Sequence, residues 1–205
     1  MQKYLLTLFG LLFSGALMAT QPTPPAPAGL AKATFAAGCF WCVEPPFDKL
    51  EGVVSTTSGY ISGHVKNPSY KDVSNGSTGH TEAVEVVYDP SKVSYQTLLE
   101  TFWVNVDPTV NDRQFCDTGS QYRPGIFWHD QNQQKLAADS IKKINQSGRF
   151  AEPVKLELTK ATTFYAAEDY HQDYYLKNPA RYNYYRWACG RDKRLKQLWG
   201  DLATQ

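Results

Sequence analysis

The chain has 205 residues, of which 42% are hydrophobic and 20% are charged, a composition typical of globular rather than disordered or collagen-like proteins. This length can bury one sizeable core, so we expect a single folded domain. The 21 basic residues nearly balance the 20 acidic ones, and a net charge of +1 gives no sign of the basic surface that nucleic-acid binding requires. We therefore expect no nucleic-acid partner.

The N-terminal segment differs from the rest of the chain. Lys3 precedes an uncharged, mostly apolar run from Tyr4 to Met18, and small residues follow. This run is about 15 residues long, shorter than the ~20 that a membrane-spanning helix needs. We therefore interpret residues 1–19 as a signal peptide, with a permanent membrane anchor as the alternative. The protein is then expected to be exported, to the periplasm, with no stable membrane insertion after signal removal.

Residues 20–30 are rich in proline, which favours an extended spacer without regular hydrogen bonding. The folded domain is expected to occupy residues 31–205 and to be monomeric. Its first half predicts strands over 32–37, 53–60 and 81–88, and a helix over 40–50 that ends before Gly52. Between the last two strands, residues 61–79 contain many Gly, Asn, Pro and Ser residues and predict a long loop, a candidate wall of a functional site.

The second half of the domain continues the alternation of helices and strands. The pattern predicts a helix from the Ser94 cap to 105, a loop over 106–124, a strand over 125–128, a helix over 130–146 and a strand over 154–160. After Thr163 the regular pattern fades into a tyrosine-rich segment. We expect an α+β fold, a two-layer sandwich with a mixed β-sheet and a long irregular C-terminal segment.

Four cysteines need an explanation: Cys39, Cys42, Cys116 and Cys189. Two structural disulfides are the usual arrangement in an exported protein, but a core of this size does not need them. Zinc would suit the spacing of Cys39 and Cys42, yet no second ligand pair completes a tetrahedral site. Three of the cysteines lie beside loops or turns with other polar groups, which favours redox or nucleophilic chemistry, and no metal or cofactor is expected.

Cys39 lies where a predicted strand passes into a helix. Free N–H groups and the positive end of the helix dipole at this point stabilise a thiolate, so Cys39 is placed to be a nucleophile. Phe40 and Trp41 follow directly and offer aromatic faces that suit a small apolar group such as a methyl.

Several short motifs occur in one order along nearly the whole domain. They are Gly38-Cys39-Phe40-Trp41, Ser58-Gly59-Tyr60, Asn67-Pro68-Ser69-Tyr70, Gly79-His80-Thr81-Glu82-Ala83-Val84, Tyr88-Asp89-Pro90, Asp117 with Gly119 and Gln121-Tyr122-Arg123, and Ala167-Glu168-Asp169-Tyr170-His171-Gln172. In these motifs the sequence strongly resembles the peptide methionine sulfoxide reductase A family. One departure is Pro124, where Ser commonly follows Gln-Tyr-Arg.

The resemblance implies reduction of methionine S-sulfoxide, free or in oxidised proteins, to methionine. It assigns Cys39 as nucleophile, Glu82 as proton donor, Tyr70, Tyr122 and Asp117 as groups around the sulfoxide oxygen, and Phe40 and Trp41 as the grip on the methyl. The chemistry agrees, because a thiolate attacks a sulfoxide sulfur only as the oxygen gains a proton or strong hydrogen bonds. His80, His129 and His171 are expected to be structural. A thioredoxin-like reductant would restore the enzyme.

The resemblance also implies that a second cysteine resolves the sulfenic acid on Cys39. Cys189 lies beside Gly190 on the C-terminal segment, where similar family members carry such a cysteine, so we predict a Cys39–Cys189 disulfide. Cys42 is second choice because of its closeness in sequence, and Cys116 is third. Two other function classes remain open, a thiol–disulfide oxidoreductase using Cys39 and Cys42, and a secreted binding module held by two disulfides.

Overall fold

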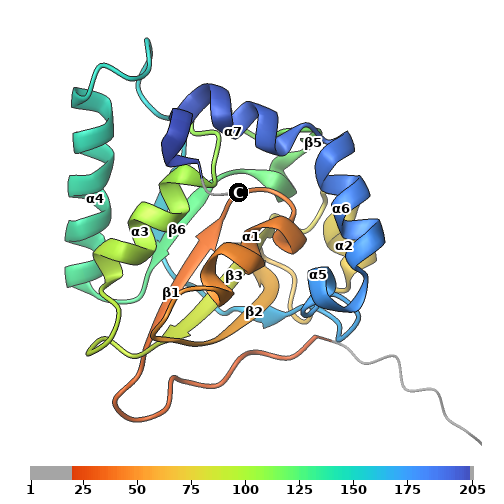
Figure 1. Ribbon diagram of the computed structural model, residues 1–205. Helices are drawn as coiled ribbons and strands as arrows, with labels where there is room; N and C mark the ends of the chain where they lie inside the picture. Colours follow the sequence, from red (N-terminus) through yellow and green to blue (C-terminus); the bar gives the residue numbers. More distant parts are fainter. Residues whose placement is uncertain (1–19, 204–205) are drawn as a thin grey trace, which may run out of the picture.

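The computed structural model describes residues 20–203 of the chain. Its centre is a six-stranded sheet with the order β7-β6-β1-β3-β2-β8 (Figure 1). The strands are β1 (Ala31–Ala36), β2 (Val53–Ile61), β3 (Thr81–Tyr88), β6 (Gly125–Trp128), β7 (Glu157–Lys160) and β8 (Tyr165–Ala166). Only β6 and β7 pair in parallel among these strands of the described chain, which confirms the mixed sheet.

Three helices pack together on one face of the sheet: α1 (Phe40–Asp48), α3 (Tyr95–Val104) and α4 (Gln131–Gln146) (Figure 1). The main core lies between these layers. Phe35 of β1 stacks on Phe47 of α1 at 5.0 Å between ring centroids and on Phe102 of α3 at 5.4 Å. The α+β two-layer sandwich is therefore confirmed.

The opposite face of the sheet carries a smaller apolar cluster, which includes Ile61, Ala83, Phe127 and Phe164. Neighbouring residues of β3 face opposite sides of the sheet, so Ala83 belongs to this smaller cluster and Val84 to the main core. Most of β3 is consequently buried on both faces, and this strand provides a rigid support for any functional residue at its start.

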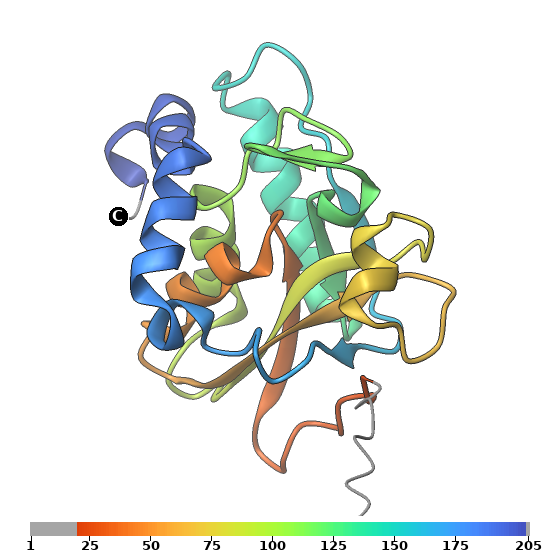
Figure 2. The same cartoon turned by 90° about the vertical axis from the view of Figure 1, so that its right-hand side faces the viewer.

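The C-terminal segment is helical, and the expectation of an irregular one was wrong. It forms α5 (Tyr174–Lys177), α6 (Pro179–Ala188) and α7 (Arg191–Trp199), which pack one after another beside α1 (Figure 2). Pro179 begins α6, where its missing N–H costs nothing, and Gly190 separates α6 from α7 at a φ of 67°. The many tyrosines obscured the helical period, because each combines an apolar ring with a polar tip.

Both long loops contain short elements that the sequence pattern did not reveal. α2 (Tyr70–Ser74) begins at Ser69 with a capping box that Asp72 completes. The second loop holds a hairpin, β4 (Arg113–Gln114) with β5 (Asp117–Thr118), and a 3₁₀ turn at Ser120–Tyr122. These short elements fix the loops that carry Tyr70, Asp117 and Tyr122.

The proline-rich segment before β1 is extended, and its first residues contact the sheet. Pro22 forms a β-bridge with Tyr165 of β8. The proposed signal peptide, residues 1–19, lies outside the described residues. Across residues 20–203, no helix combines the length and the apolar character needed to cross a membrane.

Candidate active site

The turn that delivers Cys39 joins β1 to α1 and depends on Gly38. Gly38 has a φ of +83°, and a Cβ there would lie 2.5 Å from the Cβ of Gln114. Only glycine fits both the backbone conformation and this close approach. Cys39 then occupies the N-cap position of α1, as the sequence predicts, with 8% of its surface exposed.

Glu82 is the second residue of β3 and reaches the same helix terminus. Its Oε2 accepts a hydrogen bond of 3.1 Å from the backbone N–H of Phe40, so its carboxyl group lies beside the first turn of α1. Burial raises the pKa of Glu82 to about 8, although this hydrogen bond acts against the shift. At neutral pH the carboxyl group is therefore mostly protonated and can donate a proton next to Cys39.

The helix terminus does not make Cys39 a low-pKa thiol, contrary to the expectation from its position. Burial, a hydrogen bond with Cys42 and the negative field of Glu82 raise the pKa of Cys39 well above its ordinary value. The same contact with Cys39, aided by Arg191 and Arg186, lowers the pKa of Cys42 to about 7 against the effect of burial. Cys39 therefore holds its proton more tightly than Cys42, and the Cys42 sulfur can accept that proton when Cys39 attacks as a thiolate.

Tyr70, Tyr122 and Asp117, which the resemblance assigns to the sulfoxide oxygen, lie close enough to Cys39 and Glu82 for the charges of these groups to act on one another. Burial and the field of Glu82 raise the pKa of Tyr70 to about 12, and the same two causes raise that of Tyr122 further. Both phenols therefore keep their protons and can donate hydrogen bonds to an oxygen. Fields from Cys39 and Asp117 also act on both tyrosines, as expected if the five groups surround one site.

Phe40 and Trp41 form an aromatic wall with His171. Phe40 is buried, with its ring 5.0 Å from that of His171, while half-buried Trp41 stacks on Tyr174 at 3.7 Å. The Trp41 indole N–H donates to His171 Nδ1 at 2.9 Å, and burial lowers the pKa of His171 to about 4. His171 is therefore neutral and orients Trp41, the structural role that the sequence assigned to it.

Two positioning residues escaped the sequence analysis. Glu168 accepts hydrogen bonds from the backbone N–H of Tyr70 at 2.8 Å and from the Tyr60 hydroxyl at 3.0 Å. The Tyr185 hydroxyl donates to Asp117 at 2.5 Å. Glu168 lies inside a quoted motif, which was the available signal, whereas nothing distinguished Tyr185 from the neighbouring tyrosines.

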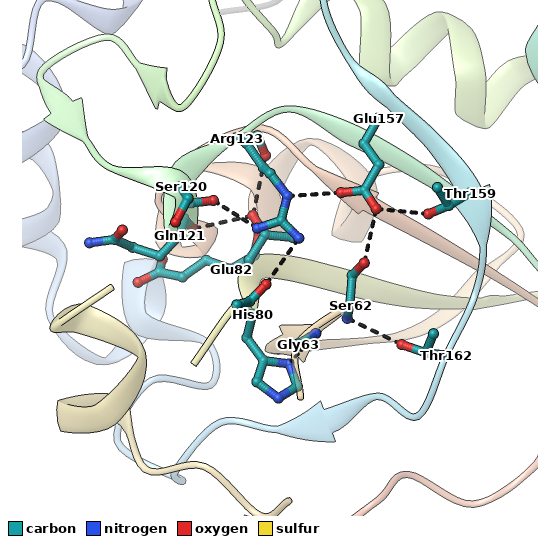
Figure 3. Close-up of polar contacts among 12 residues, drawn as sticks. Ser62, Gly63, His80, Glu82, Ser120, Gln121, Arg123, Glu157, Thr159 and Thr162 are labelled. Atoms are coloured by element: carbon teal, nitrogen blue, oxygen red, sulfur yellow. Dashed lines mark hydrogen bonds and ion pairs between the residues drawn. The ribbon is translucent and has the colours of Figure 1, made fainter. Parts of the chain in front are cut away.

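A polar network holds the loops next to Glu82 (Figure 3). Arg123 donates to Glu157 at 2.8 Å, to the Ser120 carbonyl at 2.8 Å and to the Gly79 carbonyl at 3.1 Å. His80 accepts from the backbone N–H of Gly63 through Nδ1, which makes it a structural residue of this network. The start of β3 and the turn that carries Tyr122 are thereby fixed to each other.

The cysteine pairing differs from the prediction. Cys189 forms a disulfide with Cys116, with the Cα atoms 5.0 Å apart, while Cys39 and Cys42 are free and buried. The turn between α6 and α7 brings Cys189 to the β4–β5 hairpin, a contact that the sequence could not indicate for an assumed irregular tail. This disulfide lies near the site. Arg191, two residues after Cys189, donates a hydrogen bond of 3.1 Å to the carbonyl of Ala37, which is two residues before Cys39.

The family model described as peptide methionine sulfoxide reductase matches residues 31–203. The chain is 48% identical over 168 residues to the peptide methionine sulfoxide reductase MsrA of Bacillus licheniformis, covering 82% of this chain and 93% of that protein. It is 49% identical over 170 residues to the corresponding MsrA of Listeria innocua, covering 83% of this chain and 96% of the relative.

Solved structures give the same result. Reduced Mxr1 from Saccharomyces cerevisiae has a TM-score of 0.70 at 32% identity, over 77% of this chain and 90% of that one. Methionine sulfoxide reductase A of Corynebacterium diphtheriae has a TM-score of 0.67 at 32% identity, over 79% of this chain and 88% of that one. Sequence, fold and site geometry agree, and the chain belongs to the peptide methionine sulfoxide reductase A family.

Proposed function

We propose that this protein is a thioredoxin-dependent reductase that converts methionine S-sulfoxide, free or in oxidised proteins, to methionine. The observation that carries the proposal is the placement of the Glu82 carboxyl group beside Cys39 at the start of α1. The curated relatives are peptide methionine sulfoxide reductases. Mxr1, the yeast protein with this fold, has also been solved in complex with Trx2, in keeping with a thioredoxin-like reductant.

In the proposed reaction Glu82 protonates the sulfoxide oxygen, which Tyr70 and Tyr122 also bind through their hydroxyl groups. Phe40 and Trp41 hold the methyl group, and the Cys39 thiolate attacks the sulfoxide sulfur. The oxygen ends on the sulfur of Cys39 as a sulfenic acid, and methionine leaves. Sulfoxide sulfur is thereby reduced by two electrons and Cys39 is oxidised by two.

Cys189 then attacks the sulfenic acid, releases water and forms a Cys39–Cys189 disulfide. Cys116 attacks Cys189 in turn and frees Cys39, which leaves the Cys116–Cys189 disulfide for the reductant. This order accounts for a structure in which Cys39 is free and Cys189 is bonded to Cys116. Cys116 is also exposed, so a dithiol protein can reach it.

Cys116→Ser is expected to trap the first disulfide. After one turnover with methionine sulfoxide, mass mapping should find Cys39 bonded to Cys189, because Cys116 is no longer there to attack Cys189 and free Cys39. Cys189→Ser should still release one methionine per enzyme but lose turnover with thioredoxin. A Cys39–Cys42 disulfide in the Cys116→Ser variant, with thioredoxin turnover intact in Cys189→Ser, would transfer the resolving role to Cys42.

A thiol–disulfide oxidoreductase remains the alternative, since Cys39 and Cys42 have the spacing and helix position of that chemistry. The two activities can be separated with dithiothreitol and racemic methionine sulfoxide. A sulfoxide reductase selective for one epimer should consume half of the substrate. Insulin disulfide reduction without sulfoxide loss would favour the alternative, which leaves Glu82 and both site tyrosines without a role.

We further propose that the protein is exported and acts in the periplasm after removal of residues 1–19. The apolar N-terminal run supports this proposal. A glutathione pool of the cytosolic kind would not supply electrons in that compartment, so a thioredoxin-like carrier that receives its electrons from elsewhere is required. Cell fractionation should find the shortened protein in the periplasmic fraction, and full-length protein in the cytoplasm would contradict the proposal.

A further inference from the structure

The first described residues, Thr20–Thr23, form a short segment that we call the N-terminal strap. It lies at the edge of the sheet beside β8 and forms the start of the red and orange trace that leads to β1 across the lower part of Figure 1. The family model begins at residue 31, so the strap lies outside the part of the chain that the family defines. Its contacts nevertheless lead to the site.

The strap pairs with β8 through backbone hydrogen bonds. The N–H of Ala166 donates to the Gln21 carbonyl at 3.1 Å, and the N–H of Thr23 donates to the Phe164 carbonyl at 3.0 Å. β8 is a two-residue strand at the edge of the sheet, where unpaired backbone groups face outward. The strap satisfies those groups and holds the chain that leads to Glu168.

The start of the strap contacts a second segment. The Thr20 hydroxyl donates to the Pro68 carbonyl at 2.6 Å, and the Thr20 side chain is buried, with 5% of its surface exposed. Pro68 is buried and directly precedes Ser69, the N-cap of α2. Tyr70 is the first residue of that helix, so the strap holds the chain two residues before a phenol of the site.

Both contacts converge on Tyr70. Glu168, two residues after β8, accepts the backbone N–H of Tyr70 at 2.8 Å, and Pro68 lies on the chain that enters α2. We propose that the N-terminal strap is a positioning element that fixes Tyr70 for the sulfoxide oxygen through Thr20, Pro68 and the β8 segment. The proposal rests on the proposed function, in which Tyr70 donates a hydrogen bond to that oxygen.

The test compares three substitutions made in the complete chain. Thr20→Val keeps the shape of the side chain but removes the hydrogen bond to Pro68, and Thr20→Ser restores the hydroxyl. Thr23→Val is the matched control, since it removes a contact of the same strap with Lys32 at 3.3 Å and leaves Pro68 untouched. We expect kcat/KM for methionine sulfoxide to fall about 5-fold in Thr20→Val, the effect of one net hydrogen bond, and to recover in Thr20→Ser.

A double-mutant cycle identifies the residue through which the strap acts. In a Tyr70→Phe background the hydroxyl that the strap positions is absent. Thr20→Val should therefore cause no further loss of kcat/KM in that background. An equal loss in both backgrounds, an unchanged kcat/KM in Thr20→Val, or a loss of the same size in Thr23→Val would overturn the proposal.

Hydrogen exchange separates this inference from the proposed function. Backbone exchange over residues 67–74 should be faster in Thr20→Val than in the parent protein or Thr23→Val, whichever reaction the enzyme catalyses. If the parent protein does not reduce methionine sulfoxide, the proposed function fails while this measurement still reports on the strap. Unchanged exchange over these residues would show that the strap does not position α2.

Discussion

Replacement of Cys39 by serine is expected to abolish methionine sulfoxide reduction. A serine hydroxyl does not ionise near neutral pH and cannot take the sulfoxide oxygen as a sulfenic acid, so the first step is lost. The measurement is methionine released per enzyme in a single turnover, followed by chromatography. Because Cys39 packs into a preformed turn and serine is smaller, the fold should persist, and the circular dichroism spectrum checks this.

Cys116→Ser is the matched control for Cys39→Ser. Cys116 is exposed and does not take the oxygen in the proposed reaction, so this variant should still release one methionine per enzyme. Release of methionine at the parent rate by Cys39→Ser would remove Cys39 from the role of nucleophile.

Replacement of Glu82 by glutamine should lower kcat about 10²-fold or more while substrate still binds. Glutamine keeps the shape of the side chain and can accept the hydrogen bond from Phe40, but it has no proton to transfer to the sulfoxide oxygen. The protonated form of Glu82 prevails below its pKa of about 8, so activity of the parent enzyme should fall as the pH rises through that value. The glutamine variant should lose this part of the pH profile.

Glu85→Gln provides the control for Glu82→Gln. Glu85 lies on the same strand and is buried, but it pairs with Lys32 at 2.8 Å instead of facing Cys39. Its substitution should leave the pH profile of sulfoxide reduction unchanged, even where it reduces stability. Parent-like turnover in Glu82→Gln would show that another group supplies the proton.

The sequence predicted the elements in which the residues that face the core can be told from the other residues by their apolar character. β3 alternates between two apolar faces and was found at its predicted bounds. The C-terminal helices were missed because tyrosine is both apolar and polar, and no strong period remained. The disulfide between Cys116 and Cys189 was missed for the same reason, since it depends on how α6 and α7 return to the hairpin.

The site shows a similar division. Cys39 could be predicted as a nucleophile because it lies where a strand passes into a helix. The family motifs supplied the role of Glu82 at the start of β3 and the roles of the other site residues. The high pKa of Cys39 could not be predicted, because it depends on how much water the fold removes around the sulfur. Glu168 and Tyr185 act from distant positions in the sequence, and only the folded chain shows what they hold.

The bond between Cys116 and Cys189 closes a loop across a separation of 73 residues. A crosslink of that span restricts the unfolded chain and favours the native state by about 4 kcal/mol in the chain-entropy model. In each catalytic cycle, formation of this bond therefore raises the free energy of unfolding, and its reduction lowers it again. We therefore expect the oxidised enzyme, which waits for electrons, to resist heat and proteases better than the reduced form, so that a shortage of reductant preserves the protein until the supply returns.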